Sequence, residues 1–285
     1  MKSGILQGER KFHHPPRVVS FGEILFDVIE GVPCLGGAPL NLAVHLHRQG
    51  AETTLISAVG ADPLGRSALK QIQEFGLDTG SIAVLEKFPT GTVTVSLDER
   101  KVASYQFASD TAYDHIPVPE FKGEVDLLCF GTLAQRSEES RTALARLRKS
   151  MDCLFFYDVN LRQNFYSKEI VGESLESADV VKLNEEEFPV LASMFGVEEN
   201  LETFARRFGL QMVLRTLGPD GCDLYAEGRI IHSPAYPVKV VSTVGAGDSF
   251  SAAFLYRWLT GETLEKALEA GNRLAAEVAG HKGAV

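Results

Sequence analysis

The stretch TTLISAVGADPLGRSALKQIQEFG (residues 53–76) contains one complete βα unit. Its first seven residues are mostly apolar or β-branched, which is typical of a buried strand. Leu64, Ala68 and Ile72 then recur at helical spacing, and this pattern stops at Gly76. A strand followed directly by an amphipathic helix is the unit from which mostly parallel sheets are built.

The same alternation continues along the chain. Another amphipathic helix is predicted around Leu144 and Leu147. Five more runs are predicted to be buried strands: VVSF (18–21), VDLLCF (125–130), CLFFY (153–157), VVKL (180–183) and MVLRT (212–216). We therefore predict an α/β fold with a mostly parallel central sheet flanked by helices.

Two segments break this pattern, LFDVIEG (25–31) and TGTVTVSLDERKVASYQF (90–107). The alternating runs of the second segment flank the polar turn Asp98–Lys101, as in a hairpin. We predict a small separate β-sheet that serves as a lid, made of residues from about 25–36 and 88–112. Because no repeat or linker divides the chain, residues 1–285 are predicted to form a single domain.

Composition excludes several classes of protein. A formal charge of −10 and a pI near 5.3 disfavour nucleic acid as a partner. The four cysteines form no CxxC pair, so neither a zinc site nor a disulfide scaffold is indicated. With no signal-like N-terminus and no run of about 20 apolar residues, we expect a soluble cytoplasmic protein that does not enter a membrane.

Polar or glycine-rich segments follow three of the predicted strands, at 158–162, 184–187 and 217–221. Ligands of open parallel sheets bind outside the carboxyl ends of the strands, where these segments would converge. The segment NEEE (184–187) has an alternative explanation, because it could simply be the capped, acidic first turn of a helix.

The strongest local signal is STVGAGDSF (242–250), which opens a helix. The small residues Gly245, Ala246 and Gly247 would let a phosphate approach unpaired backbone amides at the positive end of that helix. Asp248 would then stand beside the phosphate, with its carboxylate free to accept a proton. The alternative is a plain glycine turn followed by an early helical Asp.

A second glycine motif, GGAPLN (36–41), precedes another helix. Gly36 and Gly37 would bring the backbone close to a ligand, and Asn41 would stand in the first turn of the helix.

In combination, these motifs resemble those of the ribokinase-like (PfkB) carbohydrate kinases, and of fructokinase-like members in particular. SFGEILFD, GGAPLN, DVNLR, KLNEEE, TLGPDG and VGAGD occur in the order and spacing of that family, from about Val18 onward. The resemblance implies a ribokinase-like fold and an enzyme that phosphorylates a hydroxyl of a small sugar with ATP. It also implies Asp248 as the base and residues 245–247 as the anion hole.

The resemblance assigns further roles. The sugar would be held by Asp27, Gly36, Gly37, Asn41 and Arg162. The ATP side would contain Asn184, Glu187, Thr216, Gly218, Gly221 and Asn272, with Glu187 organising Mg²⁺ through water. Ser242 replaces an Asp of the family motif, which weakens the expectation of potassium activation. Relatives often pair through their lids, so a homodimer is one expected assembly.

Other functions remain as alternatives. A dehydrogenase is disfavoured because no GxGxxG follows a strand, and a P-loop nucleotidase because no Gly-Lys pair occurs. A non-catalytic relative that binds sugar and regulates a partner would be expected to lose the base or the anion hole, and both are present. GGAPLN and DVNLR favour fructose, while 2-keto-3-deoxygluconate and nucleosides remain alternative substrates.

Overall fold

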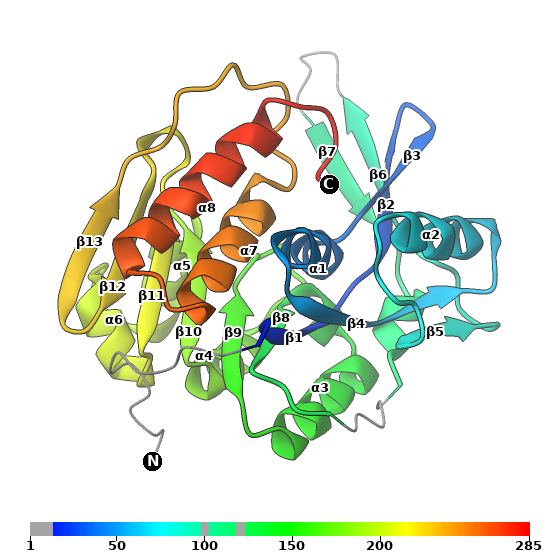
Figure 1. Cartoon of the computed structure of the whole chain (residues 1–285). Coiled ribbons are helices and arrows are strands. Elements are labelled where there is room, and N and C mark those ends of the chain that lie inside the picture. Colours follow the sequence, from blue (N-terminus) through cyan, green and yellow to red (C-terminus); the bar gives the residue numbers. More distant parts are fainter. Residues whose placement is uncertain (1–13, 98–102, 118–122) are drawn as a thin grey trace.

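The predicted buried runs form one large sheet (Figure 1). The computed structural model describes residues 14–97, 103–117 and 123–285, so the predicted turn Asp98–Lys101 lies outside the described residues. In these residues the sheet has the order β13-β12-β11-β10-β9-β8-β1-β4-β5. Its strands are β1 (Arg17–Phe21), β4 (Glu52–Gly60), β5 (Ile82–Leu85), β8 (Leu127–Gly131), β9 (Leu154–Asp158), β10 (Val180–Asn184), β11 (Met212–Thr216), β12 (Cys222–Ala226) and β13 (Arg229–Ser233).

The direction of the strands confirms the predicted fold class. All neighbours from β5 to β11 pair in parallel, and only β12 and β13 add antiparallel hairpins at one edge. From β1 the chain builds outward through β4 and β5, and it then returns to place β8 on the other side of β1. The order therefore reverses between β1 and β8, and the carboxyl ends of these strands are the expected place for a ligand.

Helices cover both faces of this sheet, because each buried strand presents apolar side chains to both sides. Within β8, Leu127 and Cys129 pack with helices α1, α7 and α8, whereas Leu128 and Phe130 pack with helices α3 to α6. The helices are α1 (Ala38–Gln49), α2 (Pro63–Glu74), α3 (Glu138–Ser150), α4 (Lys168–Ser177), α5 (Glu187–Phe195), α6 (Leu201–Phe208), α7 (Ala246–Leu259) and α8 (Leu264–Ala279), with the 3₁₀ turns η1 (Ala112–His115), η2 (Leu133–Arg136) and η3 (Gly218–Asp220).

The two irregular segments form the predicted small sheet, which stands beside the main body (Figure 1). Its order is β3-β2-β6-β7, from strands β2 (Leu25–Ile29), β3 (Val32–Gly36), β6 (Gly91–Leu97) and β7 (Ala103–Phe107). We call these four strands the lid sheet. Its presence confirms the prediction of a separate small sheet, while its movement as a lid and the single-domain organisation stay predictions.

Two further features of the chain bear on its chemistry. Cys34, Cys129, Cys153 and Cys222 are all free thiols. Among residues 14–97, 103–117 and 123–285, none of the helices combines the length and the apolar character needed to cross a bilayer.

Candidate active site

The glycine motif at 245–247 forms the start of α7. Gly245 caps the helix with φ of 80°, a left-handed conformation that favours glycine. A Cβ added there would lie 2.5 Å from Cβ of Ala284, so the position is also crowded. The first helical bond runs from the amide of Ser249 to the carbonyl of Gly245, at 2.9 Å. The amide of Ala246 donates to the carbonyl of Thr243 at 3.3 Å. The amides of Gly247 and Asp248 precede the first helical bond and belong to the open end of the helix, where an anion can bind.

Asp248 lies in the same turn and faces the start of α1. Its Oδ2 accepts a hydrogen bond from Nδ2 of Asn41 across 2.8 Å. Asn41 is buried in the first turn of α1, where its amide bonds the carbonyl of Gly37 at 2.9 Å. The two glycine motifs, which are far apart in the sequence, therefore meet at one carboxylate.

The surroundings of Asp248 make it a better base than an exposed carboxylate. Removal from water raises its pKa to about 6, and the negative charge of Asp158 adds to this rise. The positive charges of Lys182 and Arg162, and the hydrogen bond from Asn41, act in the opposite direction. A carboxylate with this pKa is ionised at neutral pH and accepts a proton more readily than an ordinary Asp.

The residues expected on the sugar side gather between β2, α1 and the loop after β9. A Cβ on Gly36 would lie 3.2 Å from Oδ2 of Asp27, and a Cβ on Gly37 would lie 2.4 Å from the carbonyl oxygen of Glu23. Burial raises the pKa of Asp27, and the positive charge of Arg162 opposes that rise. Asp27 and Arg162 are therefore within electrostatic reach of each other.

The loop that carries Arg162 has an unusual backbone. Asn160 and Gln163 adopt positive φ values of 41° and 47°, which few residues other than glycine do. The amide of Leu161 is fixed by a 2.8 Å bond to Oε1 of Glu187. The guanidinium of Arg162 is left exposed in this loop, on the side of the acidic residues.

The residues expected on the nucleotide side follow β10 and β11 at the same edge of the sheet. Oδ1 of Asn184 accepts bonds from the amides of Glu186 and Glu187, at 2.9 and 2.8 Å, so the side chain of Asn184 holds the turn that leads into α5. Oε2 of Glu187 accepts in turn from the amide of Asn184 at 2.8 Å. The NEEE segment is thus the turn that leads into a helix, and both oxygens of Glu187 already accept backbone bonds.

The TLGPDG loop lies next to this segment. The amide of Glu185 donates to the carbonyl of Thr216, the last residue of β11, at 3.0 Å. Gly218 and Gly221 have φ of 54° and 93°, and a Cβ on Gly221 would lie 2.1 Å from the carbonyl oxygen of Ser233. Gly221 is therefore required by lack of space as well as by its conformation, whereas Gly218 is favoured by its conformation alone.

Asn272 is used differently from the other expected residues. It is buried in α8, and its Nδ2 lies 3.1 Å from the carbonyl oxygens of both Ser233 and Pro234. Its amide therefore holds the chain that leaves β13, and its contact with a nucleotide stays a prediction.

Comparison with known proteins identifies this arrangement. Residues 17–285 match the model of the pfkB family carbohydrate kinases. The chain belongs to this family.

Individual relatives agree with this membership. A putative sugar kinase of Pyrococcus horikoshii is 32% identical over 263 residues, which cover 84% of this chain and 81% of the relative. Its crystal structure in complex with ATP matches with a TM-score of 0.83 at 30% identity, over 94% of this chain and 93% of the other.

Two fructokinases are also similar. Fructokinase-1 of Oryza sativa subsp. japonica is 29% identical over 94% of this chain and 93% of its own. The structure of a fructokinase from Vibrio cholerae O395 with fructose, ADP and a calcium ion matches with a TM-score of 0.82 at 25% identity, over 94% of both chains. The predicted resemblance, the fold class and the assignment as a sugar kinase are confirmed.

In this pfkB family kinase, two buried charged residues near Asp248 received no role from the sequence. Nζ of Lys182 lies 3.0 Å from Oδ1 of Asp158, and a Cβ on Gly247 would lie 3.1 Å from the same ammonium. Lys182 therefore brings a positive charge close to Gly247, on the inner side of the predicted anion hole. The sequence could have indicated that Lys182 is paired with an acidic residue, because Lys182 lies within the apolar strand VVKL and a Lys is rarely buried unless it is paired.

The other residue is Glu23, in the SFGEILFD motif. It is 2% exposed, and its Oε2 has no hydrogen-bond partner in the described part of the chain. The pKa of Glu23 is raised to about 7, mainly by burial and in part by the charge of Asp248.

Proposed function

We propose that this carbohydrate kinase transfers the γ-phosphoryl group of ATP to a hydroxyl of a small neutral sugar, with fructose as the first candidate. The observation that carries the proposal is the position of Asp248, which combines a raised pKa with the helix start that provides the anion hole. The ATP complex of the Pyrococcus relative and the fructose complex of the Vibrio relative support the choice of both substrates.

The reaction can be derived from this geometry. Asp248 accepts a hydrogen bond from the sugar hydroxyl, and it takes the proton as the oxygen attacks the γ-phosphorus and the bond to the β-phosphate oxygen breaks. Amides of Gly247 and its neighbours hold the phosphoryl oxygens, and the ammonium of Lys182 adds positive charge behind them. In a loose transition state the proton leaves late, so a base with a pKa of about 6 is sufficient.

Mg²⁺ fits the donors on the nucleotide side. The described residues contain no cluster of three His, Cys, Asp or Glu that could hold a metal. Mg²⁺ with ATP is commonly held by phosphates and waters and by only one or two carboxylates. The remaining lone pairs of Glu187 suit a water-mediated contact, and Mg²⁺ would neutralise phosphate charge there. Thr216, Gly218 and Gly221 are proposed to line the nucleotide, with Asn272 beside the adenine.

The proposal is tested by measuring ADP release with Mg²⁺-ATP across fructose, other hexoses, 2-keto-3-deoxygluconate, ribose and nucleosides. Sugar-dependent turnover that disappears in Asp248→Asn would establish the function and name the substrate. Binding of sugar and ATP without ADP formation would instead favour a non-catalytic regulatory protein. Turnover only with 2-keto-3-deoxygluconate or a nucleoside would reject fructose while retaining the kinase.

Potassium is proposed to be unnecessary for activity. Oγ of Ser242, which replaces an Asp of the family motif, accepts a 3.2 Å bond from the amide of Val244. A neutral hydroxyl holds a monovalent cation less strongly than a carboxylate. Equal rates in potassium and tetramethylammonium salts would support this proposal, and activation by potassium alone would reject it.

Assembly and location are proposed on two further observations. The lid sheet exposes the apolar residues Ile29, Val32 and Tyr105, which supports a homodimer that pairs through this sheet. A monomeric mass by light scattering at assay concentration would reject the dimer. The four free thiols support a reducing compartment such as the cytoplasm.

A further inference from the structure

The segment that follows α8 runs back toward α1 and lies against the turn that precedes α7 (Figure 1). We call residues 283–285 the outer segment. Within it, Ala284 is only 6% exposed, and the side chain of Val285 packs against the apolar cluster that contains Leu40 and Val44 of α1. The outer segment is therefore in contact with both α1 and the start of α7.

Ala284 packs directly against the glycine that caps α7. A Cβ added to Gly245 would lie 2.5 Å from Cβ, 2.6 Å from Cα and 2.7 Å from the carbonyl oxygen of Ala284. The position of Ala284 therefore limits where the turn at Gly245 can lie. Gly247 and Asp248, whose amides belong to the open end of the helix, follow in the first turn of α7.

A buried histidine holds Ala284 in this position. Nε2 of His45 lies 2.8 Å from the carbonyl oxygen of Ala284, and His45 is only 4% exposed. Because a carbonyl oxygen can only accept, Nε2 must carry a proton and donate it. Burial lowers the pKa of His45, so at neutral pH the ring is neutral with its proton on Nε2. Loss of this donor would leave the carbonyl unpaired, which is unfavourable for a buried group.

One face of α1 therefore acts twice on the start of α7. His45 and Asn41 are four residues apart in α1, so their side chains lie on the same side of that helix. Asn41 bonds Asp248, in the first turn of α7, whereas His45 bonds Ala284, which packs against the cap of α7. The first contact is direct, and the second passes through the outer segment.

We propose that His45 is a positioning residue of the phosphate site, which holds Ala284 against Gly245 and thereby keeps the amides at the start of α7 in place for the phosphates of ATP. The inference rests on the proposed function, because it takes the 245–247 turn to be the phosphate site. His45 acts on ATP only through Ala284, so its loss should weaken ATP binding and leave sugar binding unchanged.

His45→Leu tests this inference, because it removes the donor and keeps a buried side chain of similar size. We expect the KM for ATP to rise about three- to tenfold while the KM for the sugar stays unchanged. His45→Gln retains an N–H group at a similar distance from the backbone and should keep the KM for ATP close to that of the wild type. A purely structural role predicts instead a lower Tm with no change in the KM for ATP.

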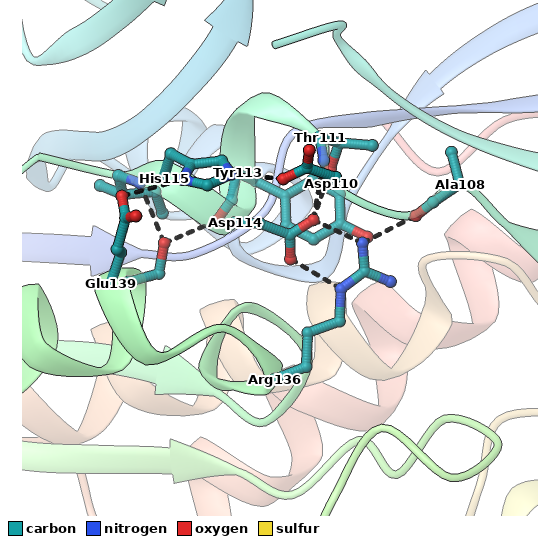
Figure 2. A network of polar contacts seen from close by, with 10 residues as sticks. Ala108, Asp110, Thr111, Tyr113, Asp114, His115, Arg136 and Glu139 are labelled. Atoms are coloured by element: carbon teal, nitrogen blue, oxygen red, sulfur yellow. Dashed lines mark hydrogen bonds and ion pairs between the residues drawn. The ribbon is translucent and has the colours of Figure 1, made fainter.

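His115→Leu is the matched control. The two ring nitrogens of His115 lie 2.7 Å from Oδ1 of Asp110 and 2.8 Å from Oε2 of Glu139, at the root of the lid sheet (Figure 2). Neither partner belongs to the outer segment or to the start of α7. The control therefore removes histidine hydrogen bonds elsewhere and should leave the KM for ATP unchanged, even where it lowers Tm. An equal rise of this KM in His115→Leu would overturn the inference.

A double-mutant cycle tests the path through Ala284. Because the new Cβ of Gly245→Ala meets Ala284, release of Ala284 in His45→Leu should reduce the effect of Gly245→Ala on ATP affinity. Additive effects of the two changes would overturn the inference. So would an unchanged KM for ATP in His45→Leu, or a His45→Gln variant as impaired as His45→Leu.

Titration calorimetry with Mg²⁺ and ATP, in the absence of sugar, separates this inference from the proposed function. Wild-type protein that binds ATP but phosphorylates no sugar would reject the proposed function, and the same titration of His45→Leu would still test the role of His45. Equal affinity of His45→Leu and the wild type for ATP would overturn that role. If the wild type binds no ATP, both proposals fail.

Discussion

Asn41 holds Asp248 by a 2.8 Å hydrogen bond between side chains that are 207 residues apart. The bond places the carboxylate between the start of α1, which is the proposed sugar side, and the start of α7, which is the proposed anion hole. In the proposed reaction, this residue pair aligns the sugar hydroxyl with the phosphate. The catalytic predictions below depend on this alignment.

Asp248→Asn should lower kcat by about 10²–10⁴-fold, because the amide can still bond Asn41 but cannot accept a proton. Steady-state kinetics with the best sugar of the panel would measure the loss. Asp78→Asn, an exposed Asp→Asn change in the loop before β5, is the matched control and should leave kcat unchanged. Near-normal turnover in a folded Asp248→Asn protein would contradict the assignment of the base.

Activity should fall as the pH drops through about 6, because protonated Asp248 can no longer accept the proton of the sugar hydroxyl. The groups that set this pKa besides burial are Asp158, Lys182, Asn41 and Arg162. The pH profile of kcat/KM for the sugar would show the acid limb. The residual activity of Asp248→Asn should not fall at low pH in this way. If the variant shows the same fall in activity, a group other than Asp248 is responsible for it.

Stability should change with pH in the opposite direction to activity. The pKa of Asp248 rises from 3.8 to about 6 on folding, so its contribution to stability is full at low pH and is lost as the pH rises through about 6. Above that pH, Asp248→Asn should therefore melt higher than the wild type, by about 2–4 °C. Thermal melts at pH 4 and pH 8 would test this, and a difference that does not grow with pH would contradict it.

The central sheet could be predicted because buried parallel strands are apolar on both faces. Runs such as VVSF and TTLISAV are therefore continuously apolar or β-branched, and they can be told apart from the helices, in which apolar and polar residues alternate at helical spacing. Asp248 could be placed at a helix start because the small residues before it, Gly245 to Gly247, are typical of a tight turn into a helix. In the structure, Gly245 has a φ of 80°, which is the left-handed conformation that such a turn requires.

Side-chain partners across the sheet could not be predicted in the same way. Lys182 meets Asp158 because β10 and β9 pair in parallel with these two residues opposite each other. The sequence of one strand does not show which residue of another strand lies opposite it when a helix separates the two strands. Asn272 could be placed in a helix, but its bonds to the chain after β13 were not predictable.

Lys182→Met should destabilise the protein by about 3–5 kcal/mol, because it leaves Asp158 buried without its partner. Loss of the positive charge should also move the acid limb of activity to higher pH, since Lys182 lowers the pKa of Asp248. Urea unfolding and the pH profile would measure the two effects. Lys182→Met combined with Asp158→Asn should recover stability but not turnover, and equal stability of the single variant and the wild type would contradict the pairing.

Gly245→Ala should damage both folding and ATP binding, and a second glycine separates the two causes. Gly196, at the end of α5, has a φ of 64° with nothing within 4 Å of an added Cβ, so Gly196→Ala should cost only the left-handed strain of about 1–2 kcal/mol. At Gly245 the new Cβ would also lie 2.5 Å from Cβ of Ala284, whose carbonyl oxygen is held 2.8 Å from Nε2 of His45.

Ala284 therefore cannot move aside easily, and the start of α7 must shift instead. Gly245→Ala should accordingly lower Tm more than Gly196→Ala does and should raise the KM for ATP, because the amides of the anion hole move with the helix start. Gly196→Ala should leave the KM for ATP unchanged. Equal losses of Tm in the two variants, with the ATP KM unaffected in both, would show that the 245–247 turn is a structural turn and not the phosphate site.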